Sequence, residues 1–323
     1  MPCTEMIWCR AFFFQMTKNK QNEYISVMKQ IELLPTLSLS QLVYGVWRLD
    51  EKTQSEKEMS KLFDTCLSLG IDSFDHADIY NDYANEAFFG RLLKENPSKR
   101  HQIKIITKCG IQLLSQKKPL TKVKHYDYSK EHLTYSVEKS LANLHTDYID
   151  LLLLHRPSPL LNVDIVAETL SSFISSGKVR HIGVSNFTPA QFQLLQSRLD
   201  FELITNQIEL NFNQLQPLID GSIDFLYQRK IKPMIWSPLG GGSIFENGNV
   251  NLNKQFQLLG AKYEIGADVL ALAWLLKHPA QLIPVIGTVK TERIISAVKA
   301  CAIDLELQEW FQLYEAALGN EVP

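Results

Sequence analysis

The feature that most constrains this fold is a regular alternation of short apolar runs with amphipathic stretches of helical length, which begins near Leu37. Eight apolar runs are predicted strands, at residues 42–47, 71–74, 103–107, 149–154, 181–184, 203–208, 232–236 and 282–286. Between them, apolar residues recur three and four positions apart, as on one face of a helix, at 55–69, 85–95, 130–144, 163–176, 189–197, 221–228 and 267–277. Nearly continuous apolar strands are typical of parallel strands buried on both faces. The alternation therefore predicts an α/β fold, the (β/α)8 TIM barrel.

An open, doubly wound sheet is the alternative arrangement for alternating strands and helices. Such sheets carry a G-x-G-x-x-G nucleotide-binding turn after the first strand, whereas this chain has only Gly45 there. A length of 323 residues would allow one domain or two, but no Pro-, Ser- or Gly-rich linker interrupts the pattern. We therefore expect a single barrel domain over residues 28–323.

Residues 1–27 do not follow this pattern. The stretch 6–16 is apolar except for Arg10 and Gln15, and it is too short for a helix that spans a bilayer. A secretory signal would need a basic segment before the apolar core and a small-residue cleavage site, and neither is present. We expect 1–27 to be a disordered or non-native leader, with Met28 as the true start, and a membrane anchor as the weaker alternative.

Charge and cysteine usage exclude several classes of protein. Lys and Arg total 33 against 35 Asp and Glu, a formal net charge of -2, which argues against a nucleic-acid partner because such proteins carry a basic excess. The five cysteines include no C-x-x-C pair, so neither a zinc site nor a disulfide framework is indicated. We expect reduced thiols and a cytoplasmic location.

Catalytic residues of a (β/α)8 barrel stand at the carboxyl ends of its strands. Asp75 and Tyr80 follow the second predicted strand, Lys108 the third and His155 the fourth. An ammonium beside a phenol makes the phenol a better acid, a carboxylate would hold that ammonium, and a histidine can hydrogen-bond a substrate oxygen. The set suits protonation of a carbonyl oxygen while a hydride reaches the carbonyl carbon.

Other chemistries find less support in the sequence. No G-x-S-x-G motif for a serine nucleophile is present. His76 and Asp78 are close in sequence but lack an evident third ligand, so no metal site is expected. A barrel hydrolase or isomerase is therefore a remote alternative.

Four separated motifs resemble the signatures of the aldo-keto reductases. They are Asp75-x-Ala77-x-x-Tyr80, Thr107-Lys108, Leu154-His155 and the stretch GKVRHIGVSNF from Gly177 to Phe187. Within that family the chain is most similar to the bacterial YdhF-type oxidoreductases. The resemblance implies a barrel that reduces aldehydes and ketones with NADPH and without a metal. It makes Tyr80 the proton donor, Lys108 the group that tunes its pKa, Asp75 the partner of Lys108, and His155 the group that orients the carbonyl.

The resemblance also implies a set of cofactor and pocket residues. Ser185, Asn186 and Gln207 would hold the nicotinamide carboxamide, and Trp236 would stack on the nicotinamide ring. The pyrophosphate would be bound by Ser237, Leu239, Gly240 and Gly241. The 2'-phosphate would be bound by Thr288, Lys290 and Arg293. Two cations at the last position favour NADPH over NADH. Trp47 would line the substrate pocket with Tyr80 and His155. The chain departs from the family at Ser296-Ala297, where a Glu-Asn pair often contacts adenine.

The remaining expectations concern the surroundings of this site. Residues 111–128, after the third strand, are expected to cover the substrate site and to line it with Tyr126 and Tyr128. Structural interpretations apply to Asp78 (a turn residue), His76 (packing behind Tyr80), His181 (within a strand), and Arg156 and Arg180 (ion pairs at the rims). The expected partner is a small-molecule carbonyl substrate, and the chain would be a monomer or a weak homo-oligomer. A cofactor-binding regulatory subunit with little turnover is the alternative function.

Overall fold

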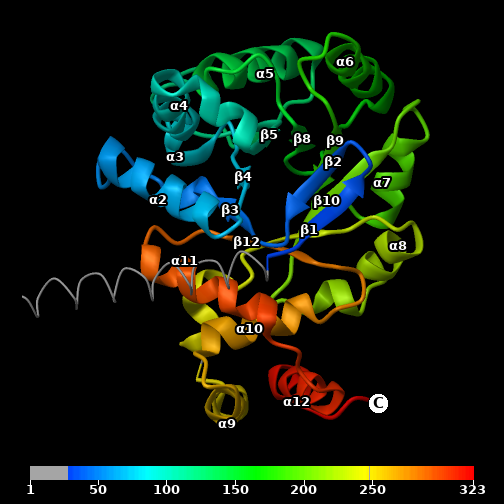
Figure 1. The fold of residues 1–323 in the computed structure, drawn as a ribbon. Coiled ribbons are helices and arrows are strands. Elements are labelled where there is room, and N and C mark those ends of the chain that lie inside the picture. Colours follow the sequence, from blue (N-terminus) through cyan, green and yellow to red (C-terminus); the bar gives the residue numbers. More distant parts are fainter. Residues whose placement is uncertain (1–27, 247) are drawn as a thin grey trace, which may run out of the picture.

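A closed barrel of eight parallel strands forms the centre of the molecule (Figure 1). The computed structural model describes residues 28–246 and 248–323, so the predicted leader at 1–27 lies outside the described residues. Around the barrel the strands are β3 (Val43–Gly45), β4 (Ser73–Asp75), β5 (Lys104–Cys109), β8 (Leu151–Leu154), β9 (Ile182–Ser185), β10 (Leu203–Glu209), β11 (Met234–Trp236) and β12 (Ile283–Ile286). β12 pairs with β3 and closes the ring. The predicted (β/α)8 barrel and all eight predicted strands are confirmed.

Helices surround the barrel, and seven of them match predicted stretches: α2 (Glu56–Ser68), α4 (Asn85–Glu95), α5 (Lys130–Leu144), α6 (Val163–Ser175), α7 (Pro189–Gln196), α8 (Ser222–Gln228) and α10 (Ala267–Leu276). Their starts follow local chemistry: Ser55 and Glu58 form a capping box at α2, and Thr188 and Gln191 form one at α7. Three further helices, α9 (Val250–Tyr263), α11 (Thr291–Val298) and α12 (Leu307–Leu318), complete the outer layer. The described residues include no helix long and apolar enough to cross a membrane.

Short elements connect these layers. They are α3 (Tyr80–Tyr83), the 3-10 turns η1 (Val46–Arg48), η2 (Pro97–Gln102), η3 (Gln216–Leu218), η4 (Gly240–Phe245) and η5 (Lys299–Ala302), and the paired strands β6 (Ile111–Gln112) and β7 (His125–Tyr126). Several of them follow the carboxyl ends of barrel strands, where the candidate site lies.

The amino end of the barrel is closed by an antiparallel hairpin that the sequence analysis did not predict. Its strands, β1 (Gln30–Leu34) and β2 (Leu37–Ser40), lie across the front of the barrel in Figure 1. The apolar side chains of the hairpin form one buried cluster with inward-facing strand residues such as Ile106 and Met234. With this end filled, the opposite end is left for ligands.

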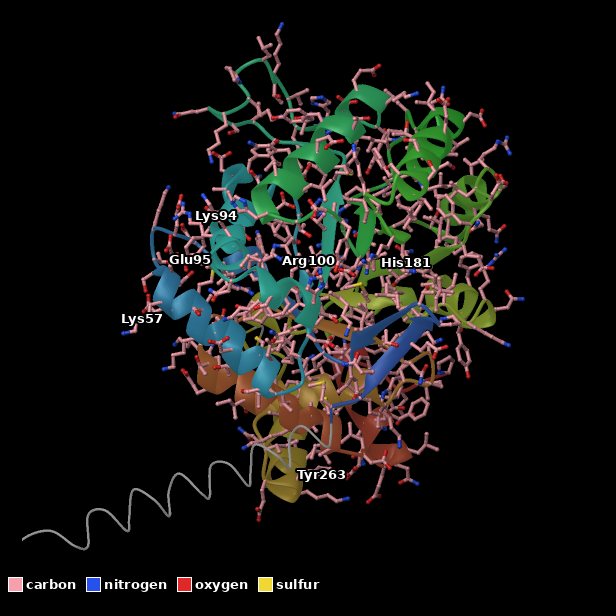
Figure 2. All side chains as sticks on the ribbon, turned by 45° about the horizontal axis from the view of Figure 1, so that its top comes forward. Lys57, Lys94, Glu95, Arg100, His181 and Tyr263 are labelled. Carbon is pink, nitrogen blue, oxygen red and sulfur yellow. The ribbon has the colours of Figure 1, made fainter. Side chains whose placement is uncertain are left out.

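Charged groups at the amino end are structural. Arg100 is buried and donates to Asp150 (2.7 Å) and to the carbonyl oxygens of Ile103 and Tyr148. Arg180 lies 3.7 Å from Asp150, which confirms the ion pair predicted for it. His181 contacts Thr36 of the hairpin (2.9 Å) and a backbone carbonyl, in line with its predicted structural role. Figure 2 shows Arg100 and His181 toward the middle of the molecule.

Candidate active site

A buried lysine forms the centre of the site. Lys108, on β5, is 1 % exposed, and its Nζ donates to Asp75 Oδ2 (2.6 Å), to the carbonyl oxygen of His76 (2.7 Å) and to the Tyr80 hydroxyl (3.1 Å). Asp75 ends the neighbouring strand β4, and Tyr80 begins α3 directly after it. Parallel pairing of β4 with β5 therefore brings a carboxylate, an ammonium and a phenol together at the carboxyl ends of the strands.

The electrostatics of this group keep the lysine charged and the phenol protonated. Burial would lower the pKa of Lys108, but Asp75 and the Tyr80 oxygen outweigh it and hold that pKa above its usual value. Burial also raises the pKa of Tyr80, while the Lys108 ammonium acts in the opposite direction. Tyr80 is therefore protonated at neutral pH and lies beside an ammonium that favours its phenolate form.

His155 lies next to Tyr80. It follows β8, its backbone N–H donates to the carbonyl of Cys109 (2.9 Å), and its ring lies edge-on to Tyr80 with centroids 6.1 Å apart. Burial first, and then Lys108, Arg156 and Lys124, hold the pKa of His155 well below its usual value. The neutral ring can donate a hydrogen bond to a substrate oxygen beside Tyr80. The structure thus brings together all four residues predicted to be catalytic.

A chain of amide groups leads away from Asp75 across three strands. Gln207 Nε2, on β10, donates to Asp75 Oδ1 (3.0 Å), and the Gln207 carbonyl accepts from the Ser185 hydroxyl (2.9 Å). Asn186 Nδ2 donates to Ser185 Oγ (2.7 Å), and Asn186 Oδ1 accepts from Trp236 Nε1 (2.9 Å). Four of the predicted cofactor residues therefore form one connected network with the catalytic carboxylate.

The loop after β11 carries the predicted pyrophosphate residues, among them Ser237, Leu239, Gly240 and Gly241. Ser237 and Gly240 have positive φ, and the Gly240 N–H donates to the Ser237 carbonyl (2.8 Å). At Gly241, also with positive φ, the nearest atom to an added Cβ would be an Arg48 nitrogen 3.9 Å away. The backbone of this loop is therefore open to a ligand, as a phosphate-binding loop requires.

Arg48 is a candidate anion-binding residue that the sequence analysis did not identify. Its guanidinium donates to the Gly287 carbonyl (3.1 Å), after β12, and lies near Gly241, after β11. The cation also lies 5.4 Å from the ring of the neighbouring Trp47. The Trp-Arg pair after the first strand was visible in the sequence, but only barrel closure through β12 and β3 brings the cation to these two glycines.

The predicted 2'-phosphate residues lie where α11 begins. The Thr288 hydroxyl accepts from the N–H of Lys290 (3.2 Å), and the Thr288 carbonyl accepts from buried Tyr44 (3.1 Å). Lys290 and Arg293 are exposed. Ala297, at the predicted departure from the family, is buried in the core and is no candidate for an adenine contact.

The segment 111–128 folds back on α3, the helix that begins with Tyr80. The N–H of Leu113 donates to the Tyr83 hydroxyl (2.8 Å), and Lys117 donates to the Asp82 carbonyl (2.7 Å). Gly110 opens the segment with φ +109, and a Cβ there would lie 2.2 Å from the Tyr128 ring. Only glycine fits this approach.

The three predicted pocket aromatics have different environments. Trp47 is 62 % exposed. Tyr126 and Tyr128 line a groove of about 260 Å³ beside the connection from β8 to α6. The Tyr128 hydroxyl is bonded to both the N–H and the carbonyl of Arg156, so it fixes the backbone after His155.

The predicted ion pair of Arg156 was wrong. No carboxylate of the described residues lies within 4.0 Å of its guanidinium. The guanidinium lies instead over the Trp236 ring, 5.2 Å from its centroid. The two residues are 80 positions apart in the chain, and no local pattern could have paired them.

Asp78 and His76 lie between Asp75 and Tyr80 in the chain. Asp78 lies in the predicted turn and accepts from the Ser136 hydroxyl (3.0 Å), while its other oxygen, Oδ1, is buried without a partner among the described residues. Burial and the nearby Glu86 carboxylate raise the pKa of Asp78 to about 8. His76 is fully buried, edge-on to Phe89 at 4.6 Å, which fits the predicted packing role, and burial lowers its pKa to about 3. The described residues contain no cluster of three or more His, Cys, Asp or Glu that could hold a metal ion.

Comparisons with known proteins agree with this geometry. Residues 41–317 match the model of the Aldo/keto reductase family. The chain is 43% identical to the uncharacterized oxidoreductase YcsN of Bacillus subtilis over 92% of this chain and 100% of that protein. It is 42% identical to a 6-dehydroglucose reductase of Agrobacterium fabrum (91% of this chain, 100% of that one) and 42% identical to oxidoreductase YdhF of Escherichia coli (88% and 95%). A crystal structure of the thermostable aldo-keto reductase Tm1743 superposes with a TM-score of 0.77 over 90% of this chain and 100% of that one, at 23% identity.

Proposed function

The chain belongs to the aldo/keto reductase family, and from that premise we propose that it uses NADPH to reduce aldehydes or ketones to alcohols, with Tyr80 as the general acid. The observation that carries the proposal is the buried Lys108 ammonium, bonded both to Asp75 and to the Tyr80 hydroxyl. An ion pair buried to this degree is expensive to desolvate. A phenol that must release a proton gives a reason for placing the pair there.

The proton path follows from these contacts. Tyr80 gives its proton to the carbonyl oxygen as that oxygen gains negative charge. Lys108 stabilises the phenolate, and Asp75 keeps the ammonium in place. His155, held neutral by its surroundings, donates a hydrogen bond to the same oxygen and so orients the carbonyl.

The residues present fit a nicotinamide dinucleotide. Ser185, Asn186 and Gln207 supply amide and hydroxyl groups for a carboxamide, Trp236 offers a ring face for stacking, and the open backbone at Gly241 suits a pyrophosphate. NADPH, when bound, supplies the hydride. We assign Arg48 to the pyrophosphate, and Thr288, Lys290 and Arg293 to the 2'-phosphate.

Tyr80→Phe tests the mechanism. We expect NADPH oxidation with aldehydes to fall by about two to four orders of magnitude, the usual share of general acid catalysis. Binding of NADPH, followed by its fluorescence, should be unchanged because the network from Gln207 to Trp236 is intact. Full activity of Tyr80→Phe would refute the role of Tyr80. Tight NADPH binding by the unmodified protein without turnover of any carbonyl would instead favour a cofactor-binding partner subunit.

A second experiment tests the preference for NADPH. Replacing both Lys290 and Arg293 by Met should raise the dissociation constant of NADPH by about tenfold or more, since two charge-assisted contacts to phosphate are lost. The dissociation constant of NADH, which lacks that phosphate, should change little. Equal losses for both nucleotides would show that these cations do not read the 2'-phosphate. The proposed compartment is the cytoplasm, where Cys66, Cys109 and Cys301, all free thiols, stay reduced.

A further inference from the structure

The position of Arg156 across the mouth of the barrel is unexplained by the proposed reaction. Arg156 follows β8, whereas the ring under its guanidinium belongs to Trp236, at the end of β11. The strands β9 and β10 lie between β8 and β11 in the barrel. The side chain therefore reaches over two intervening strands at the end of the barrel that carries Tyr80 and His155.

The guanidinium of Arg156 has no polar partner among the residues that the structure describes. The hydrogen bonds of Arg156 involve its backbone N–H and carbonyl, both held by Tyr128. A guanidinium carries five N–H donors in a planar fork that matches a carboxylate or phosphate. A half-buried cation with a fixed backbone, an aromatic support and unfilled donors is prepared for an anion.

None of the acidic groups around the mouth forms an ion pair with Arg156, and each makes its contacts with other residues. Asp75 is paired with Lys108, and the raised pKa of Asp78 keeps it protonated at neutral pH. Glu209 ends β10 in register with Trp236, but its carboxylate accepts from Asn211 Nδ2 (3.4 Å). Asp127 accepts from the N–H of Ser129 (3.0 Å).

A second cation adds to the positive side of the mouth. Lys124 is exposed on the segment 111–128, and no carboxylate of the described chain lies within 4.0 Å of its Nζ. Both Lys124 and Arg156 are close enough to His155 to lower its pKa. The charges of two cations from different loops therefore both act on His155.

We propose that Arg156, assisted by Lys124, binds an anionic group on the substrate, so that the preferred substrates are carbonyl compounds that carry a carboxylate, sulfonate or phosphate. The inference rests on the proposed reductase function and adds the substrate class to it. Arg156 would hold the anion by a bidentate contact while the carbonyl lies between Tyr80 and His155. Lys124, being exposed, would contribute a weaker attraction.

Two aldehydes that differ in one charge test this proposal: 4-formylbenzoate and its methyl ester. We would measure kcat/KM for each aldehyde with NADPH and take the ratio of the value for the acid to the value for the ester. Comparing this ratio between variants cancels the intrinsic difference in reactivity of the two aldehydes. Arg156→Met should lower that ratio by about ten- to a hundredfold, chiefly through KM, since a charged hydrogen-bonded contact is lost. Arg156→Lys should keep part of the ratio, because it retains the charge without the fork. Lys124→Met should lower the ratio only about two- to fivefold.

Lys94→Met is the matched control. It removes the same charge from the outer side of α4, at the periphery of the molecule (Figure 2), and should leave the ratio unchanged. The dissociation constant of NADPH should also be unchanged in Arg156→Met. An unchanged ratio in Arg156→Met, with both aldehydes reduced, would overturn the inference and leave the reductase function standing. Weakened NADPH binding with an unchanged ratio would assign the cation to the cofactor. Reduction of neither aldehyde would count against both proposals.

Discussion

Removing the ammonium of Lys108 should unfold the protein more easily as well as inactivate it, and the two effects can be separated. Lys108→Met leaves the Asp75 carboxylate 2 % exposed, with the Gln207 amide as its remaining hydrogen-bond donor. At the 2.6 Å separation of the pair, the attraction is about 6 kcal/mol for an effective dielectric constant of about 20. Breaking a buried pair from one side costs about 3–5 kcal/mol of unfolding free energy in comparable proteins.

The double variant Asp75→Asn/Lys108→Met removes the uncompensated charge. The Asn side chain can still face the Gln207 amide, and no ion remains buried without a counter-ion. We expect the double variant to recover at least about half of the stability lost by Lys108→Met, since neutral replacements of a buried pair are often close to neutral. Activity should not recover, because Tyr80 still lacks the ammonium that stabilises its phenolate.

Urea unfolding, followed by tryptophan fluorescence, measures the first quantity, and NADPH oxidation with an aldehyde measures the second. The effect of Lys108→Met on stability should depend on pH. Because the folded pKa of Lys108 is raised above its usual value, the stabilisation is complete below the unfolded pKa and is lost as pH rises through the folded one. The gap in unfolding free energy between wild type and Lys108→Met should therefore narrow at strongly alkaline pH, where Lys108 loses its proton. A double variant less stable than Lys108→Met would refute the electrostatic reasoning.

Three further predictions concern residues around the site and at the amino end. Gly110→Ala should lower the free energy of unfolding by more than about 2 kcal/mol, because a strained φ and a clash with the Tyr128 ring add together. The control Gly177→Ala, with φ +73 and open space around the added Cβ, should cost only about 1 kcal/mol in the same urea assay. Arg100→Met should cost about 3–5 kcal/mol because it removes the buried cation bonded to Asp150 and leaves that buried carboxylate only the exposed Arg180, 3.7 Å away. Arg91→Met, whose ion pairs are exposed, should cost less than about 1 kcal/mol; equal losses would contradict the role of burial. Asp78 has a folded pKa of about 8, above its unfolded value, so the folded state holds a proton that the unfolded state releases, and stability should fall as pH rises from about 4 to 8. Asp78→Asn should flatten this part of the pH profile of unfolding free energy, and an unchanged slope would count against a protonated Asp78.

The sequence predicted what depends on local periodicity and missed what depends on closure. All eight barrel strands could be predicted because an apolar run of strand length is a feature of consecutive residues. The hairpin of β1 and β2 also had a local signal, since apolar and polar residues alternate through Gln30–Leu34 and Leu37–Ser40 on either side of Pro35. Helix α9 had a signal as well, with Leu252, Phe256 and Leu259 at helical spacing.

The contacts of Arg48 and Arg156 are of a different kind. Arg48 meets Gly287 from 239 positions away, and Arg156 meets Trp236 from 80 away. Neither pairing has a spacing that a strand or a helix would impose. Arg48 meets Gly287 where β12 pairs with β3, and Arg156 reaches from the end of β8 to the end of β11. The predicted ion pair of Arg156 rested only on the usual behaviour of arginine side chains at a protein surface. It failed because no carboxylate of the described residues lies within 4.0 Å of that guanidinium, although Glu209 is in register with the Trp236 beneath it.

The charge balance of the buried site links Arg156 to the proton transfer from Tyr80. Before reaction the centre is nearly neutral: Lys108 and Asp75 cancel, Tyr80 is protonated, and His155 is uncharged. If Tyr80 gives up its proton as proposed, the same centre gains one negative charge at a place that water hardly reaches. The Asp75 carboxylate already offsets part of the positive potential of Lys108. Further positive charge at the rim therefore lowers the free energy of forming the Tyr80 phenolate. Arg156 acts on Tyr80 in this direction in the free protein. An anionic substrate that occupies Arg156 would withdraw part of that help, so tighter binding of acidic substrates should come with a slower proton transfer from Tyr80.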